Sequence, residues 1–171
     1  MRALDQLPSY DAEGNLRVVI ETPRGASTKL KYDPELGVFM HSRALSLGLS
    51  YPYDWGFVPS TRAEDGDPLD VMVVHDATSF PGVVIACRPL AVLLVSQRKA
   101  GGNPDERVRN DRVIAVPAKD QRLAQQKRLD QRVKAELERF FEAAVWFTEK
   151  EARIEGWLEE EIDAYIRTLL R

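Results

Sequence analysis

The sequence contains a single cysteine, Cys87, so an internal disulfide bond is excluded. Because Cys87 ends an apolar run over residues 83–87, a buried structural thiol is favoured over a nucleophile. The chain also lacks the run of about 20 apolar residues that a membrane span needs. Its first ten residues lack the apolar stretch of a secretory signal. We therefore expect a cytoplasmic protein that does not bind to a membrane.

An excess of positive charge is absent as well. The 24 lysines and arginines are outnumbered by 27 acidic residues, which gives a net charge of -3 and argues against a dedicated nucleic-acid-binding protein. The hydrophobic share of 44% and the charged share of 30% are typical of a soluble globular chain. At 171 residues, the length predicts one domain over 1–171.

Short aliphatic runs fill the first two thirds of the sequence. Leu16, Val18 and Ile20 alternate with other residues, and further runs bounded by proline or glycine lie at 71–74, 83–87, 90–95 and 113–116. No amphipathic helix connects these runs, so a parallel βαβ sheet is disfavoured. The pattern predicts a small closed or nearly closed barrel.

The last third changes to helical periodicity. Apolar residues recur three and four positions apart from Val133 to Ala144, and Asp130 precedes them as a candidate N-cap. A second apolar stripe runs from Ile162 to Leu170. We therefore expect two C-terminal helices that each pack one face on the barrel.

The most informative segment for chemistry is the turn that contains Asp65, Asp67 and Asp70. Gly66 permits unusual backbone angles and Pro68 prevents helix formation, so the three carboxylates can converge on one point. Clustered carboxylate oxygens suit magnesium or manganese better than zinc. Taken alone, however, three aspartates in a turn are more often a solvated or capping loop than a metal site.

The surrounding motifs resemble the soluble inorganic pyrophosphatase family. The resemblance rests on the 65–70 block, on the segments 18–23, 51–59 and 113–117, and on 140–142 and 155–157, which resemble the family's helical tail. It implies an α+β, mainly β fold: a small five-stranded OB-like closed barrel flanked by two C-terminal helices. It also implies hydrolysis of pyrophosphate to two phosphates with Mg²⁺, or alternatively Mn²⁺, and a homo-oligomer, with a hexamer as one option.

The same resemblance implies roles for individual residues. The catalytic residues would be Asp67, which orients or deprotonates the attacking water, and Tyr51. The substrate-binding residues would be Lys29, Arg43, Tyr51 and Arg112. The metal ligands would be Asp65, Asp70, Asp105, Glu21 and Asn110.

Several positions depart from the family pattern. Asn110 stands in place of an acid, so that it offers a carbonyl oxygen but no charge. The neighbouring Asp111 can replace that acid only if the backbone bulges there. The other departures are Lys31 for an acid, Trp55 for a tyrosine, Arg112 for a lysine, and Ala144 and Val145 for a tyrosine–lysine pair that grips the leaving phosphate. Lys150 and Arg153 are candidate replacement donors, although a surface charge is the commoner role for such residues.

Three functions follow from this pattern. The first is an inorganic pyrophosphatase, with reduced activity as one option. The second is a hydrolase of another phosphoanhydride, such as a nucleotide or a polyphosphate, which would explain the altered pocket. The third is a catalytically impaired binding or assembly protein. Asp65, Asp67 and Asp70 favour the first two, whereas Asn110 and Ala144 favour the last two.

Overall fold

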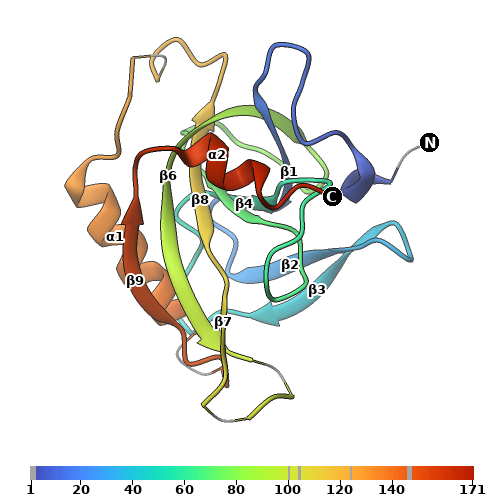
Figure 1. Ribbon diagram of the computed structural model, residues 1–171, viewed down its shortest axis with the longest axis vertical. Coiled ribbons are helices and arrows are strands. Elements are labelled where there is room, and N and C mark those ends of the chain that lie inside the picture. Colours follow the sequence, from blue (N-terminus) through green and yellow to red (C-terminus); the bar gives the residue numbers. More distant parts are fainter. Residues whose placement is uncertain (1–2, 100, 104, 124, 146–147) are drawn as a thin grey trace.

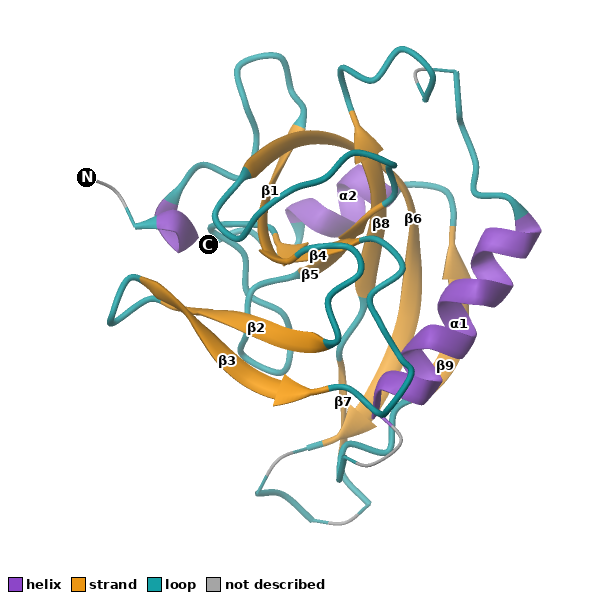
Figure 2. Cartoon of the chain, turned by 180° about the vertical axis from the view of Figure 1, so that it is seen from behind, coloured by secondary structure: helices purple, strands orange, loops and turns teal. Residues whose placement is uncertain are grey.

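The computed structural model describes residues 3–99, 101–103, 105–123, 125–145 and 148–171. Its centre is a closed ring of five strands, visible in Figures 1 and 2. In ring order the strands are β1 (Leu16–Thr22), β4 (Asp54–Phe57), β5 (Asp70–Val73), β8 (Arg112–Pro117) and β6 (Val84–Arg98). All neighbours in the ring are antiparallel except β5 and β8. The predicted mainly β fold is confirmed.

The strand β6 is longer than the sequence indicates. Two separate runs were expected, but one strand of 15 residues continues past Pro89 through an irregularity in its pairing with β8. Proline has no backbone N–H to donate, which accounts for an interrupted ladder at this point. The far half of β6 also pairs with β7 (Arg107–Arg109) and β9 (Arg153–Leu158).

The strand β9 corrects one expectation. The resemblance assigned residues 155–157 to a helical tail, whereas these residues lie in β9 and pair with β6. Gly156 has a φ of 135°, a conformation that favours glycine, at the register shift between Leu94 and Val95. A local irregularity of this kind hides the alternating pattern by which a strand is recognised.

A separate hairpin of β2 (Thr28–Asp33) and β3 (Val38–Ala44) packs outside the ring. Tyr32 of the hairpin joins a small buried cluster with Val19 and Phe57, and its ring lies 6.1 Å from that of Phe57. This contact covers the second face of β1, which explains why β1 is buried on both sides.

Both C-terminal helices are present. In α1 (Gln131–Val145), Leu137, Phe140, Phe141 and Ala144 are buried as the spacing predicts. The Asp130 carboxylate accepts a hydrogen bond from the backbone N–H of Arg132 at 2.7 Å, which confirms the expected cap. The second helix, α2 (Ile162–Arg167), buries Ile166, and a short 3-10 helix, η1 (Leu4–Gln6), lies near the N-terminus. None of the described helices is long and apolar enough to cross a membrane.

Side-chain alternation along β5 and β8 separates the two main core clusters. Val71 and Val113 belong to a cluster that gathers residues from strands across the ring, together with Ile166 of α2. Met72 and Ile114 belong to the other cluster, which contains the buried side of α1. Because side chains alternate in a strand, Asp70 and Arg112 lie on the same face as the α1 cluster.

Candidate active site

The site begins where two parallel strands start side by side. Asp70 is the first residue of β5, Arg112 is the first residue of β8, and the two are direct partners in the register. Arg112 is 5% exposed, and its guanidinium carbon lies 5.9 Å from the Trp55 ring centre and 5.0 Å from that of Phe141. The strand pairing therefore fixes an acid and a base at one edge of the ring.

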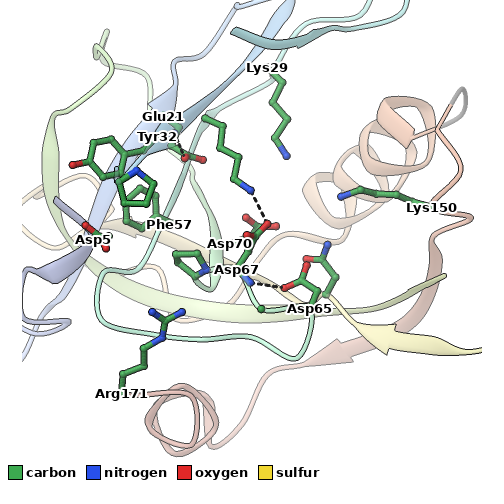
Figure 3. Close-up of a pocket in the computed structure, with 15 residues that line it drawn as sticks. Asp5, Glu21, Lys29, Tyr32, Phe57, Asp65, Asp67, Asp70, Lys150 and Arg171 are labelled. Carbon is green, nitrogen blue, oxygen red and sulfur yellow. Dashed lines mark hydrogen bonds and ion pairs between the residues drawn. The ribbon is translucent and has the colours of Figure 1, made fainter. Parts of the chain in front are cut away.

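The turn before β5 brings the other two aspartates to the same place. Gly66 has a φ of 93°, and the backbone N–H of Asp67 donates to Oδ1 of Asp65 at 3.2 Å. All three aspartates line one cavity of about 260 Å³, as the turn predicts (Figure 3). We call it the acidic cavity; its charged lining residues are Asp5, Glu21, Asp65, Asp67, Asp70, Lys29, Lys31, Lys150 and Arg171.

In two of these carboxylates, Asp65 and Asp70, the surroundings disfavour the charged form. Burial raises the pKa of Asp65, and the nearby charge of Asp70 raises it further. Burial also raises the pKa of Asp70, although the positive charges of Lys29, Arg112 and Lys150 oppose this effect. A bound cation between Asp65 and Asp70 would favour their charged forms.

Glu21 reaches the acidic cavity from an irregular point in β1. The register between β1 and β4 shifts between Ile20 and Thr22, so Glu21 is the extra residue of a bulge. Its Oε1 accepts a hydrogen bond from the backbone N–H of Tyr32 at 2.7 Å. Burial raises the pKa of Glu21 to about 7, and this hydrogen bond only partly opposes the rise.

Glu21 should make the stability of the metal-free protein depend on pH. Because its pKa is about 7 in the fold and 4.5 for an ordinary solvated glutamate, the folded state keeps a proton that the unfolded chain releases between these pH values. Stability is therefore lost as the pH rises through this window. We expect the parent to lose on the order of 3 kcal/mol of unfolding free energy across this window, and Glu21→Gln to abolish that loss.

Thermal unfolding in EDTA at pH 5 and pH 8 checks this expectation. The gain of Glu21→Gln over the parent should be larger at pH 8. The exposed Glu160 provides a matched control, since Glu160→Gln should show no such dependence. An equal effect of Glu21→Gln at both pH values would show that Glu21 keeps an ordinary pKa in the fold.

A second cavity, of about 240 Å³, adjoins the first and carries the opposite charge. We call it the basic cavity; its charged lining residues are Lys29, Lys31, Arg43, Arg112, Lys150, Asp67 and Asp70. Phe140, Phe141, Ala144 and Val145 of α1 form its apolar wall, together with Tyr51 and Trp55. Thus the predicted substrate-binding residues do come together at one cavity.

The structure defines the hydrogen bonding of Arg43 and the protonation state of Tyr51, which both line the basic cavity. Nη2 of Arg43 donates to the backbone carbonyl of Ala144 at 2.6 Å and so holds the C-terminal end of α1. Burial raises the pKa of Tyr51 far above its ordinary value, while the charge of Arg43 lowers it in part. Tyr51 is therefore a neutral hydroxyl group and can serve as a hydrogen-bond donor.

Asp67, the predicted catalytic aspartate, forms an ion pair with Lys31. Nζ of Lys31 lies 2.8 Å from Oδ2 of Asp67. Burial lowers the pKa of Lys31, but its hydrogen bond to Asp67 and the charge of Asp67 outweigh this effect and raise it. Lys31 thus supplies a resident positive charge where the resemblance predicts an acid.

The structure does not bring Asp105 to the site. Asp105 is exposed in the loop between β6 and β7, and it lines neither cavity. Gln97 lies closer to the acids: it is 5% exposed, and its Nε2 donates to Oδ2 of Asp65 at 3.4 Å. Its Oε1 accepts from Nδ2 of Asn110 at 2.9 Å. Gln97 follows Leu93 and Val95 at intervals of two, so extending the predicted strand through residue 98 would have found it.

Asp111 does not take the place of the acid that is missing at Asn110. Its Oδ1 accepts from the backbone N–H of Val95 at 2.8 Å, and its Oδ2 accepts from the Tyr165 hydroxyl at 2.6 Å. Arg109 also pairs with it at 2.9 Å. These bonds hold Asp111 away from both cavities, as expected for a neighbour on the opposite face of an extended chain.

The donor groups fit a divalent ion that is shared with a ligand. In the part of the chain that the structure describes, no three acidic, histidine or cysteine side chains are arranged to hold a metal. Among the carboxylates that line the acidic cavity are Asp65 and Asp70, and Asn110, which also lines it, can contribute an amide oxygen. Magnesium commonly binds through one or two carboxylates, several waters and substrate phosphates. The residues therefore fit Mg²⁺ best in the presence of a phosphate-containing ligand.

This chain is similar to known proteins over nearly its whole length. A family model described as inorganic pyrophosphatase matches residues 18–167. The inorganic pyrophosphatase of Synechocystis is 36% identical over 171 positions, covering 95% of this chain and 92% of that protein. The Thermus thermophilus protein is 38% identical over 164 positions, covering 92% and 89%.

Solved structures agree with this similarity. The crystal structure of inorganic pyrophosphatase from Thermus thermophilus has a TM-score of 0.87 at 35% identity and covers 98% of this chain and 97% of that chain. A structure of an inorganic pyrophosphatase from Coxiella burnetii has a TM-score of 0.83 at 28% identity, covering 95% and 97%. The similarity therefore includes the ring, the hairpin and the C-terminal helices.

Proposed function

Because the chain belongs to the inorganic pyrophosphatase family, we propose that it hydrolyses pyrophosphate to two phosphates with Mg²⁺, or alternatively Mn²⁺, as cofactor. The reaction breaks one P–O bond of the anhydride and adds the elements of water across it. Hydrolysis of another phosphoanhydride and binding without turnover are the alternatives that the altered residues raise.

The observation that supports this function is the contact between two cavities of opposite charge. Asp67, Asp70, Lys29, Lys31 and Lys150 line both cavities. A cation on the acidic side and a phosphate on the basic side would therefore be neighbours. When bound, the metal would neutralise phosphate oxygens and lower the pKa of an attacking water.

The residues of the chain would divide the remaining work. We assign Asp65 and Asp70, with the oxygen of Asn110, to the cation, and Glu21 to the outer edge of the same cavity. Asp67 would accept the proton of the attacking water after exchanging its ion pair with Lys31.

Phosphate recognition would fall to the basic cavity. Lys29 and Arg112 would bind phosphate oxygens by charge, while Tyr51 would donate a hydroxyl hydrogen bond. Arg43 has one nitrogen engaged by Ala144 and other guanidinium donors left for the ligand. Ala144 and Val145 contribute only apolar wall here, so the leaving phosphate is held by fewer groups than the family pattern implies.

Phosphate release from pyrophosphate, ATP and tripolyphosphate tests the proposal. We expect the highest rate with pyrophosphate and Mg²⁺, a lower rate with Mn²⁺, and none in EDTA. A higher rate with ATP or tripolyphosphate would assign the enzyme to another phosphoanhydride. Failure to release phosphate from any of the three with either metal would contradict the enzymatic function.

We also propose a cytoplasmic homo-oligomer, with a hexamer as one option. Large apolar side chains are exposed on and near the β2–β3 hairpin, among them Leu36 at 65%, Met40 at 46% and Phe80 at 67%. Burial of such groups against another copy would be favourable. Sedimentation analysis of the purified chain would measure its assembly state.

A further inference from the structure

The amide side chains of Gln97 and Asn110 form a short hydrogen-bonded chain that ends on Asp65. Nδ2 of Asn110 donates to Oε1 of Gln97 at 2.9 Å, and Nε2 of Gln97 donates to Oδ2 of Asp65 at 3.4 Å. Both amide residues are only 5% exposed. Gln97 lies on β6, Asn110 directly precedes β8, and Asp65 lies in the turn before β5, so these bonds connect three separate segments.

The carboxylate of Asp65 determines the orientation of both amides. An ionised carboxylate only accepts hydrogen bonds, so Gln97 directs its NH₂ group to Asp65 and its oxygen to Asn110. Asn110 in turn directs its own NH₂ group to that oxygen. If one amide turned over alone, two oxygens or two NH₂ groups would face each other in a buried place, which is costly. The three side chains therefore have one favourable arrangement.

This arrangement leaves the amide oxygen of Asn110 free. Within the described residues, no donor forms a hydrogen bond to Oδ1 of Asn110. Asn110 lines both the acidic and the basic cavity, so its oxygen is available where the two cavities adjoin. A carbonyl oxygen binds a hard cation and repels the oxygens of a phosphate. The orientation of the amide thus favours a cation at this point over an anion.

From these contacts we infer that Gln97 is a positioning residue for the proposed cation site. Gln97 lines neither cavity, and it acts by holding the Asn110 amide in the one orientation that presents an oxygen to the cation. The inference rests on the proposed function for the identity of the cation, Mg²⁺, but not for turnover. An aspartate at position 110 would not need this support, because its two oxygens make both orientations equivalent.

Calorimetric titration of the full chain with Mg²⁺ in saturating inorganic phosphate tests this inference. Gln97→Met approximately keeps the size of the side chain but removes both hydrogen bonds. We expect it to raise the dissociation constant for Mg²⁺ about tenfold, as is typical when a group that orients a ligand is lost. In an Asn110→Asp background, the same substitution should raise the dissociation constant less than about threefold. The matched control is Gln121→Met, since Gln121 is exposed, lines neither cavity, and should bind Mg²⁺ like the parent once replaced.

The comparison of the two backgrounds separates positioning from structural support. An equal loss of Mg²⁺ affinity in both would show that Gln97 only supports the fold, and the inference would be wrong. It would also be wrong if Gln97→Met bound Mg²⁺ as tightly as Gln121→Met. If Gln97→Met does not fold, Gln97→Asn replaces it in the same comparison, because its amide is one methylene too short to reach both partners.

The outcomes also distinguish this inference from the proposed function. If Mg²⁺ binding shows the expected dependence on position 110 but pyrophosphate is not hydrolysed, the inference holds and the proposed function fails. If the parent hydrolyses pyrophosphate but Gln97→Met binds Mg²⁺ normally, the proposed function holds and the inference fails. A parent that binds no Mg²⁺ would contradict both.

Discussion

Replacing Asp70 with asparagine is expected to lower the rate of pyrophosphate hydrolysis about 100-fold or more, since it removes one of the two carboxylates that we assign to the metal. Asp70 lies opposite Arg112 in the register and near Asp65, whose pKa it raises. Asparagine keeps the size of the side chain but not its charge. Steady-state rates of phosphate release at saturating Mg²⁺ measure the effect.

The same variant should bind the substrate anion more tightly when metal is absent. Asp70 is a negative charge in a cavity that otherwise carries excess positive charge, so its removal favours an anion there. Titration with pyrophosphate in EDTA therefore separates a lost metal ligand from a damaged fold, which would weaken both properties. Asp76→Asn is the matched control, because Asp76 is 75% exposed in its side chain and lines neither cavity. Rates within threefold of the parent for Asp70→Asn would contradict its assignment as a ligand.

Replacing Gly56 with alanine is expected to destabilise the fold by about 3–5 kcal/mol, at the upper end of single-substitution effects. A β-carbon at this position would lie 1.9 Å from the backbone oxygen of Val19 and 2.8 Å from its carbonyl carbon. The obstacle is backbone of the neighbouring strand, so no side-chain rotation can relieve it. For a chain of this length, the melting temperature should fall by about 10 °C.

Gly102→Ala supplies the comparison for this substitution. A β-carbon there would lie 2.8 Å from Oε2 of Glu106, the end of a flexible side chain, and 3.3 Å from Cβ and Cδ of Lys99. The Glu106 carboxylate can rotate away and the Lys99 contacts need a shift of only a few tenths of an ångström, so the melting temperature should change much less than for Gly56→Ala. A similar small change for Gly56→Ala would mean that β1 and β4 can separate at the bulge without loss of stability.

Alternation and helical spacing were sufficient to predict most of the ring and α1. The hairpin β2–β3 escaped prediction because its stability comes from Tyr32 packing on Val19 and Phe57, residues distant in the sequence. Its exposed strands show no simple apolar alternation. Such long-range packing cannot be read from a local pattern.

The structure places the three aspartates of the predicted turn at one cavity, whereas it leaves Asp105 outside both cavities. Asp65, Asp67 and Asp70 lie together because Gly66 and Pro68 constrain six consecutive residues. Asp105 was chosen by its spacing to Asn110, but the intervening chain leaves the sheet as an exposed loop before β7. Gln97, on β6, reaches the acids instead. Spacing along a sequence has structural meaning only while the chain follows a regular element.

The pairing of Asp70 with Arg112 also has a consequence for how the sheet assembles. If β5 slipped by one position against its neighbours, Asp70 would turn toward the apolar cluster that now holds Val71, and Val71 would enter the cavity. Burying a carboxylate there without a partner would be strongly unfavourable. The Asp70 carboxylate, which we assign to the metal, therefore also destabilises the incorrect alignment of β5. A variant with apolar residues at both positions would thus be freer to populate misaligned sheets, quite apart from the loss of its site.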